Sequence, residues 1–99
     1  MVNSVRFDEY VLESLMADLI GHDRMPSAYV VYLYLSWRAS GNRARSVKAS
    51  HQQIANDTGL SKSAVQAAVR HLGRRKLLRS ERASITATPE HFVLRPWRR

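Results

Sequence analysis

The segment from His51 to Arg70 spaces its small, apolar and turn-forming residues as two short helices joined by a tight turn require. Ser50 precedes the first expected helix, and its hydroxyl can accept hydrogen bonds from the free amides of the first turn. Gly59 follows that helix and can adopt the left-handed backbone conformation that a three- or four-residue turn needs. The segment therefore predicts two helices that cross steeply over a shared core.

The second helix of this pair is expected from about Lys62 to Arg74, with Ser61 as its N-cap. Its apolar positions recur at the spacing of one helix face, namely Val65, Ala68, Val69 and Leu72. In the first helix, Ile54 is expected to point into the same core, and the small side chain of Ala55 lets the two helices cross closely. The pair thus has one apolar side and one polar side.

This stretch resembles the helix-turn-helix of prokaryotic DNA-binding proteins, specifically the winged-helix kind of MarR-like and GntR-like regulators. The resemblance covers twenty residues and rests on seven structural positions, Ile54, Ala55, Thr58, Gly59, Leu60, Val65 and Ala68. A capping residue precedes each helix, which adds to the likeness. An ordinary helical hairpin is the plainer alternative for the same residues.

The resemblance implies that the polar side of the second helix faces DNA. The family's base- and phosphate-facing positions correspond here to Ser61, Lys62, Ser63, Gln66, Ala67 and Arg70. Small or hydrogen-bonding side chains on the first two turns, with no carboxylate among them, suit a helix whose N-terminal half enters a major groove. By this hypothesis Gln66 pairs with an adenine edge, and Arg70 or Lys62 contacts guanine or phosphate.

The residues after this segment extend the likeness to a β-hairpin of the kind called a wing. Residues 78–87 favour an extended backbone, Thr-Pro-Glu at 88–90 favours a turn, and residues 91–97 predict the returning strand. Residues 46–49 are expected to form the short strand that pairs with the wing. The resemblance thus predicts a mainly helical α+β fold with a small sheet.

One position departs from the family pattern. The family usually has a glycine where Lys76 stands, because the recognition helix ends there in a left-handed conformation. Gly73 offers an earlier break as an alternative, so the sequence leaves the end of the helix and the angle of the wing open.

Positive charge is concentrated outside the N-terminal segment. The chain has a formal net charge of +8, yet residues 1–23 hold one arginine against five carboxylates. All of the positive excess therefore belongs to residues 24–99, and such a field predicts binding to polyanions with an affinity that falls steeply with salt. Five basic residues are expected to hold the DNA backbone without reading sequence: Arg43, Arg45, Lys48, Arg79 and Arg82.

The N-terminal segment predicts two helices, over residues 8–20 and 26–40. The first has an apolar stripe made of Val11, Leu12, Leu15, Met16 and Leu19. On the second, one face holds Val30, Leu33, Tyr34 and Trp37, and a neighbouring face holds Tyr29, Tyr32 and Ser36. These stripes predict a core, and the first helix also offers a place where two copies of the chain could form a homodimer.

Length and composition favour a single domain of residues 1–99, divided into an N-terminal helical part (1–45), a strand with the helix pair (46–76) and the wing (77–99). There is no cysteine, and the longest apolar run, residues 29–37, is about half the length that a membrane span needs. A cytoplasmic, nucleoid-associated protein is the simplest expectation.

No motif in the sequence predicts catalysis, a metal ion or a cofactor. His22, His51, His71 and His91 are far apart and have no carboxylate at metal-ligand spacing on a shared helix face. The sequence also has no phosphate-binding glycine loop, nucleophile elbow or dinucleotide fingerprint. We therefore expect a binding protein without enzymatic activity.

The function that the sequence favours is specific binding to double-stranded DNA by a small prokaryotic transcriptional regulator. Two alternatives stay open at this point. The same fold initiates replication on plasmids and phages, and winged helices also serve as protein-interaction modules. The second alternative needs a partner over the face from Lys62 to Arg70, where the sequence has no large apolar side chains.

Overall fold

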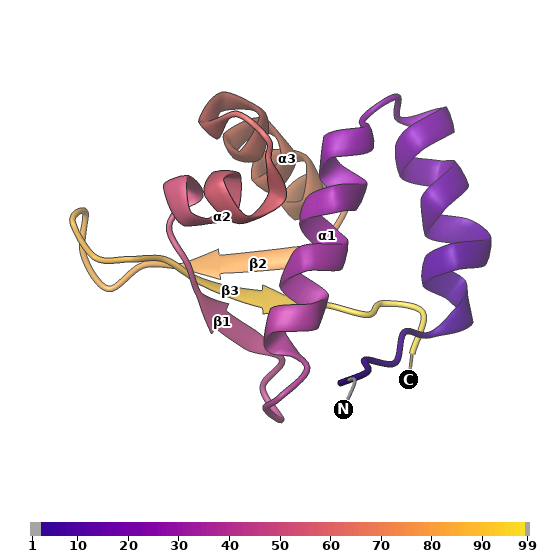
Figure 1. Ribbon diagram of the computed structural model, residues 1–99, viewed down its shortest axis with the longest axis horizontal. Helices are drawn as coiled ribbons and strands as arrows, with labels where there is room; N and C mark the ends of the chain where they lie inside the picture. Colours follow the sequence, from indigo (N-terminus) through magenta and orange to yellow (C-terminus); the bar gives the residue numbers. More distant parts are fainter. Residues whose placement is uncertain (1–2, 99) are drawn as a thin grey trace.

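Helix α1 (Pro26–Ala39) lies between the N-terminal helix on one side and the sheet with helices α2 and α3 on the other, in a computed structural model that describes residues 3–98 (Figure 1). Pro26 stands at the start of α1, where its missing N–H removes no helical hydrogen bond. Because α1 contacts the N-terminal helix, α3 and the sheet, most of its circumference is covered. The molecule is thus an α+β fold arranged around one central helix.

Of the two neighbouring apolar faces predicted for α1, the one with Tyr29, Tyr32 and Ser36 is buried, whereas the other is partly exposed. Trp37 is 52% exposed and Val30 is also exposed, whereas Leu35 and Val31 are completely buried. Elements from two sides cover α1, so helical periodicity alone could not select its interior face. Tyr32 was predicted on the neighbouring face and is buried there. Its hydroxyl donates to the Leu94 carbonyl at 2.8 Å, and burial raises its pKa to about 12.

The N-terminal helix runs from Glu9 to His22 and is wound mostly as π-helix, in η1 (Val11–Leu15) and η2 (Ala17–His22). Only every fourth residue of its predicted stripe is buried, namely Val11, Leu15 and Leu19. The expectation that Leu12 and Met16 belong to the core is wrong, because both are exposed. The N-terminal helix therefore packs against the rest of the protein through one row of residues, which is narrower than the predicted apolar stripe.

The helix pair forms as its capping residues predict. Helix α2 (His51–Thr58) begins after Ser50, whose hydroxyl accepts from the Gln53 amide at 3.0 Å, and it ends at Gly59 with φ of 83°. Helix α3 (Lys62–Arg74) begins after Ser61, whose hydroxyl accepts from the Ala64 amide at 3.1 Å. The predicted contacts between the helices are buried at Ile54, Ala55, Val65, Ala68 and Leu72.

Helix α3 ends in a left-handed residue at Lys76, not at Gly73. Gly73 lies inside the helix, which ends at Arg74 as expected, and Lys76 has φ of 58°, so the alternative of a break at Gly73 is excluded. Two hydrogen bonds close the helix end, from the Lys76 amide to the Gly73 carbonyl at 3.1 Å and from the Leu77 amide to the Leu72 carbonyl at 2.9 Å. This is a Schellman ending, and placing a lysine in it costs about 1 kcal/mol relative to glycine. The ending turns Leu77 into the core.

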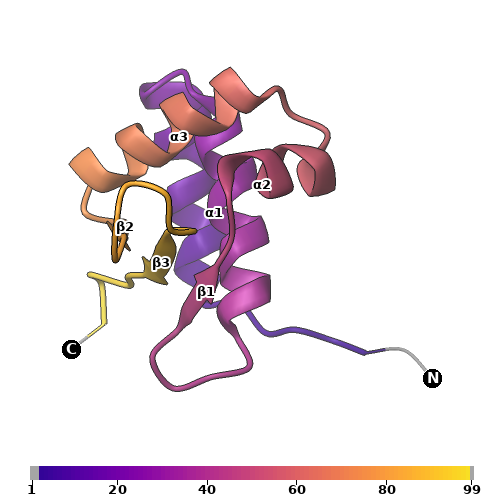
Figure 2. The same ribbon diagram turned by 90° about the vertical axis from the view of Figure 1, so that its left-hand side faces the viewer.

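The sheet has three antiparallel strands in the order β1-β3-β2 (Figure 2), made of β1 (Ser46–Lys48), β2 (Leu78–Glu81) and β3 (Glu90–Val93). Phe92 of β3 lies opposite Ser46 on one side and Arg79 on the other. The predicted pairing of the 46–49 segment with the returning strand is therefore confirmed.

Both strands of the hairpin are shorter than predicted. Residues 82–89 form a connecting loop, which we call the hairpin loop, and Glu90 belongs to β3 although a turn was predicted there. The chain leaves the extended conformation because the Ala87 amide donates to the Ser84 carbonyl at 3.2 Å and closes a turn. After β3 another turn brings the Trp97 ring onto Tyr10, with 4.5 Å between ring centroids. This contact joins the two ends of the described chain.

Candidate nucleic-acid interface

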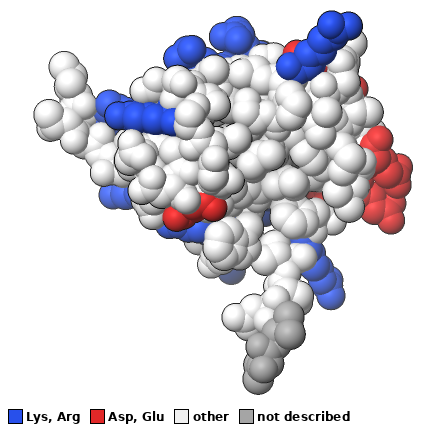
Figure 3. Space-filling view, turned by 45° about the horizontal axis from the view of Figure 1, so that its top comes forward, with Lys and Arg blue, Asp and Glu red and all other residues white. Residues whose placement is uncertain are grey.

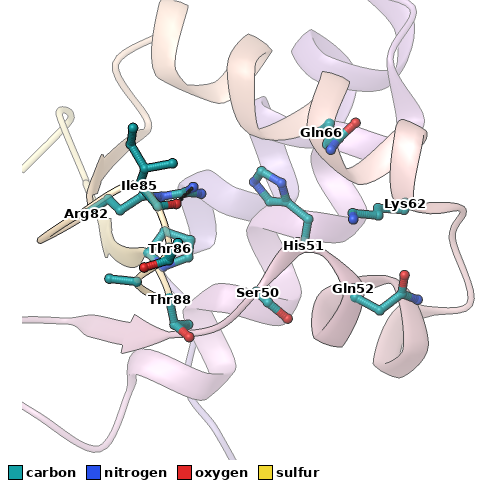
Figure 4. Close-up of a pocket in the computed structure, with 11 residues that line it drawn as sticks. Ser50, His51, Gln52, Lys62, Gln66, Arg82, Ile85, Thr86 and Thr88 are labelled. Carbon is teal, nitrogen blue, oxygen red and sulfur yellow. Dashed lines mark hydrogen bonds between the residues drawn. The ribbon is translucent and has the colours of Figure 1, made fainter.

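An open cleft of about 490 Å³ lies between the first turns of α2 and α3 and the hairpin loop (Figure 4). We call it the α3 cleft. Three residues of the predicted site line it, Lys62 and Gln66 from α3 and Arg82 from the hairpin loop. None of its lining residues is acidic. The fold therefore brings together polar and basic groups from two segments that are separated in the sequence.

The predicted face of α3 is accessible along the helix. Lys62, Gln66 and Arg70 are spaced by four residues, so they form one row along α3 that lies beside the buried Val65 and Leu72 rather than among them. Their exposure ranges from half-buried at Gln66 to exposed at both cations. The remaining predicted positions of this helix also lie outside the core: Ser61 and Ser63 are exposed and Ala67 is half-buried.

The two serines at the start of α3 have different capacities for a ligand. The Ser61 hydroxyl already accepts the capping hydrogen bond from Ala64 and lies 3.2 Å from the Ser63 hydroxyl. Ser61 is thus held in place by the helix end, and Ser63 is the freer donor. Ligand oxygens at this point would also meet the amide groups at the positive end of the α3 dipole.

His51 lines the cleft and was not among the predicted site residues. Burial lowers the pKa of its imidazole, and the positive charges of Arg82, Lys62 and Arg70 lower it further. Three cations from α3 and the hairpin loop therefore lie near one side chain, and the charged side chains that line the cleft are all basic. No sequence signal pointed to His51, because its spacing to other functional residues is not regular.

The charge distribution over the surface agrees in part with this local picture. Figure 3 shows basic side chains over the part of the molecule that holds the helix pair and the hairpin loop. The largest acidic group in that view lies at the opposite end, on the right, where the N-terminal helix is found. Basic side chains also lie at the upper right of this view and an acidic group lies at its lower left, so the two kinds of charge are only partly separated over the surface.

Of the three basic residues predicted on the strands and the hairpin, only Arg82 lines the α3 cleft. The Arg79 guanidinium lies 4.0 Å from the centroid of the Phe92 ring and is ion-paired with Glu81, so it is engaged on the outer face of the sheet. Lys48 lies in a neighbouring hollow that shares Arg82, Ala87 and Thr88 with the α3 cleft and also contains Glu81 and Glu90. Arg79 and Lys48 are therefore close to carboxylates, which reduces the attraction that they offer to phosphate, and Arg82 lies between these carboxylates and the α3 cleft.

Arg43 and Arg45 lie in the connection between α1 and β1, near the end of the sheet that is remote from the hairpin loop (Figure 1). Arg45 is half-buried and shares a hollow with Asp8 and Arg95. Its burial and the charge of Arg95 lower the pKa of its guanidinium. The structure thus places these two predicted backbone contacts away from the α3 cleft.

The buried side chain of His91 links the sheet to the segment that leads into α2, which lines the cleft. Its Nε2 lies 3.0 Å from the Ala49 carbonyl, and its Nδ1 lies 2.7 Å from the Ser80 hydroxyl. Because a carbonyl only accepts, Nε2 carries the proton and Nδ1 accepts from Ser80. One neutral imidazole therefore connects β2 and β3 to the segment that enters α2.

This histidine should make the fold sensitive to mild acid. Burial lowers the pKa of His91 below its ordinary value of 6.5. Below about pH 6.5, therefore, its imidazole is protonated in the unfolded chain but still neutral in the folded chain. The free energy of unfolding should therefore decrease as the pH falls from about 6.5 toward the lower pKa of the folded state, and should not change through this group above about pH 7. Urea unfolding at several pH values measures this dependence.

The variant His91→Gln is the control for that measurement, because its amide can still donate to Ala49 but does not titrate. It keeps His51, whose pKa is also lowered, so the difference between the two proteins isolates His91. Its stability should vary less with pH than that of the parent. Equal pH slopes for the two proteins would show that His91 is not the responsible group.

The described residues, 3–98, contain no group of three histidine or carboxylate side chains arranged to hold a metal ion. Over the same residues, no helix is both long enough and apolar enough to cross a membrane. In the comparisons with known proteins, no family model, no curated protein and no solved structure matches this chain.

Proposed function

We propose that this chain is a winged-helix protein that binds double-stranded DNA in a sequence-specific manner and acts as a small cytoplasmic, nucleoid-associated regulator of transcription in a prokaryote. The observation that carries the proposal is the α3 cleft, in which Lys62, Gln66 and Arg82 line one hollow whose charged side chains are all basic. The order of elements supports it as well, since a helix, a short strand, a capped helix pair and a hairpin follow one another along the chain.

The dimensions of α3 are compatible with a major groove. Lys62 and Arg70 are eight positions apart and span about 12 Å of helix, which corresponds to roughly three or four base pairs. Gln66 lies midway between them, and its amide can both donate to and accept from one adenine edge. The two cations then flank it at phosphate or guanine positions. One chain is therefore expected to read a short DNA sequence and to contact the DNA backbone on both sides of it.

Two single substitutions separate base reading from backbone contact. Gln66→Ala should relax the preference at one base position, at a cost of about 1–3 kcal/mol for the preferred base. Arg82→Ala should weaken all sequences alike and reduce the slope of log affinity against log salt by about 1. Selection of bound duplexes from a random pool, followed by gel-shift titration, measures both effects. If neither substitution changes duplex binding, the assignment of this face fails.

We also propose that two copies associate through their N-terminal helices. Leu12, Met16 and Ile20 are exposed and spaced by four residues, so they form an apolar line on the outside of this helix. Met16 is the midpoint of the line, so antiparallel packing about a twofold axis sets Leu12 of one copy against Ile20 of the other. In Figure 1 this helix lies at the far end of the molecule from the hairpin loop, which leaves the α3 cleft open in both copies.

Sedimentation equilibrium of the full chain tests the dimer. The parent should sediment at about twice the mass of one chain, which is 11.3 kDa. Leu12→Glu should sediment as a single chain, because it places a charge in the apolar line. A parent that stays at 11.3 kDa at concentrations of about 100 μM contradicts the proposal, since stable homodimers associate well below that concentration.

A further inference from the structure

The hairpin loop carries an apolar side chain that the packing of the fold does not use. Ile85 is 90% exposed, far more than the other exposed large apolar residues, of which Leu12 is next at 55%. The hairpin loop extends away from the body of the molecule (Figure 1), so the chain's own core does not cover this residue. An isoleucine in this position contributes little to folding, and its surface is available to a ligand.

The backbone at Ile85 is held in a defined shape. The Arg82 side chain donates from Nη1 to the Ile85 carbonyl at 3.1 Å, and the Ala87 amide donates to the Ser84 carbonyl at 3.2 Å. The hydroxyls of Ser84 and Thr86 lie 3.5 Å apart, on either side of Ile85. Arg82 therefore braces the turn from inside while the isoleucine side chain points out of it (Figure 4).

The surroundings of Ile85 favour DNA over a protein as its partner. Ile85 lines the same α3 cleft as Lys62 and Gln66, and residues 82–89 include one arginine and no carboxylate. Its neighbours Ser84 and Thr86 are polar and small, so the loop offers a single apolar side chain rather than the extended area of a stable protein interface. One apolar side chain between polar neighbours and a guanidinium suits insertion into a stack of bases.

We propose that Ile85 is a wedge that enters the minor groove and partly unstacks one base step, which kinks the duplex. This inference rests on the proposed function: if α3 lies in the major groove, we expect the hairpin loop, which forms the other side of the α3 cleft, to reach the adjoining minor groove. Apolar wedges of this kind kink duplexes by tens of degrees, and flexible pyrimidine–purine steps accept them most readily. The chain would then select DNA in two ways, by the base contacts of α3 and by how easily the base step at Ile85 can be deformed.

The test uses the full chain and a duplex of about 30 base pairs recovered from a random pool with the parent protein and labelled with a fluorescent dye at each end. The parent should increase energy transfer between the ends, because a kink brings them closer. Ile85→Ser should bind roughly tenfold more weakly and leave the energy transfer near that of free DNA, whereas Ile85→Leu should keep both properties. Because Ile85 is exposed, both variants should unfold at the temperature of the parent.

The outcomes distinguish the wedge from the function on which it rests. If no duplex is recovered, the proposed function fails together with the wedge. If a duplex is recovered and Ile85→Ser bends and binds it like the parent, the wedge alone is wrong. The wedge is also wrong if Ile85→Ser changes only the sedimenting mass, because that result assigns Ile85 to a contact between proteins.

Discussion

Replacement of Lys62 and Arg70 together by alanine is expected to weaken binding to duplex DNA by roughly 100-fold near 0.1 M salt, because each cation loses a charge-assisted hydrogen bond of about 1.5 kcal/mol. Both side chains are exposed on α3, and among residues 3–98 neither forms an ion pair with a carboxylate. They can therefore contact phosphate without giving up an internal partner. The slope of log affinity against log salt should also fall by about 2.

The matched control removes the same number of charges at another place. Arg6 and Arg24 are exposed, lie outside the α3 cleft and are not among the predicted DNA contacts. The double variant Arg6→Ala/Arg24→Ala loses two positive charges, as Lys62→Ala/Arg70→Ala does. Fluorescence anisotropy at several salt concentrations should show a small loss for the control and the large loss for the α3 variant. Equal losses would mean that total charge, and not this face of α3, governs binding.

The helix pair could be predicted because its determinants are local. Ser50, Gly59 and Ser61 act on backbone groups within three or four residues, and the structure shows the two caps and the left-handed turn where the sequence predicts them. These features of the helix pair depend little on the rest of the chain. The pairing of residues 46–49 with the returning strand was expected from the resemblance to winged helices, since local sequence does not specify a contact between segments so far apart in the chain.

The features that could not be predicted depend on contacts between distant segments. Arg79 was expected to face DNA, but its guanidinium contacts Phe92, which the sheet register places opposite it. The environment of Arg45 similarly depends on Arg95, fifty residues later in the chain. His51 joins the cleft only because the sheet places the hairpin loop across from the first turn of α2. Residue type and local spacing carry no information on such neighbours.

The end of α3 illustrates how tertiary packing overrides a local preference. Gly73 is the residue that enters a left-handed conformation at least cost, yet Lys76 adopts it. Ending the helix at Lys76 sends Leu77 and Leu78 into the core, where both are buried. Burial of two leucine side chains stabilises the fold by about 3 kcal/mol or more, which exceeds the cost of about 1 kcal/mol for a left-handed lysine. Burial of the two leucines therefore determines where the helix ends.

Leu35→Ala is expected to lower the free energy of unfolding by about 3–5 kcal/mol, the largest change in stability that we expect from a single substitution. Leu35 is 0% exposed on α1, the helix that contacts the N-terminal helix, α3 and the sheet. Its truncation therefore leaves a cavity at the point where several elements meet, and relaxation of one element cannot fill it. In a domain of this size the melting temperature should fall by roughly 15 °C or more.

Leu12→Ala makes the same chemical change on the N-terminal helix, at a residue that the sequence assigned to the core and the structure leaves 55% exposed. Its free energy of unfolding should change by less than about 0.5 kcal/mol when urea unfolding is measured at a concentration where the parent sediments as one chain. The two substitutions thus compare the loss in free energy of unfolding at a leucine of the central helix with the loss at a leucine that only the hydrophobic spacing would place in the core. Similar losses at both positions would restore Leu12 to the core and would remove the apolar line from the surface of the N-terminal helix.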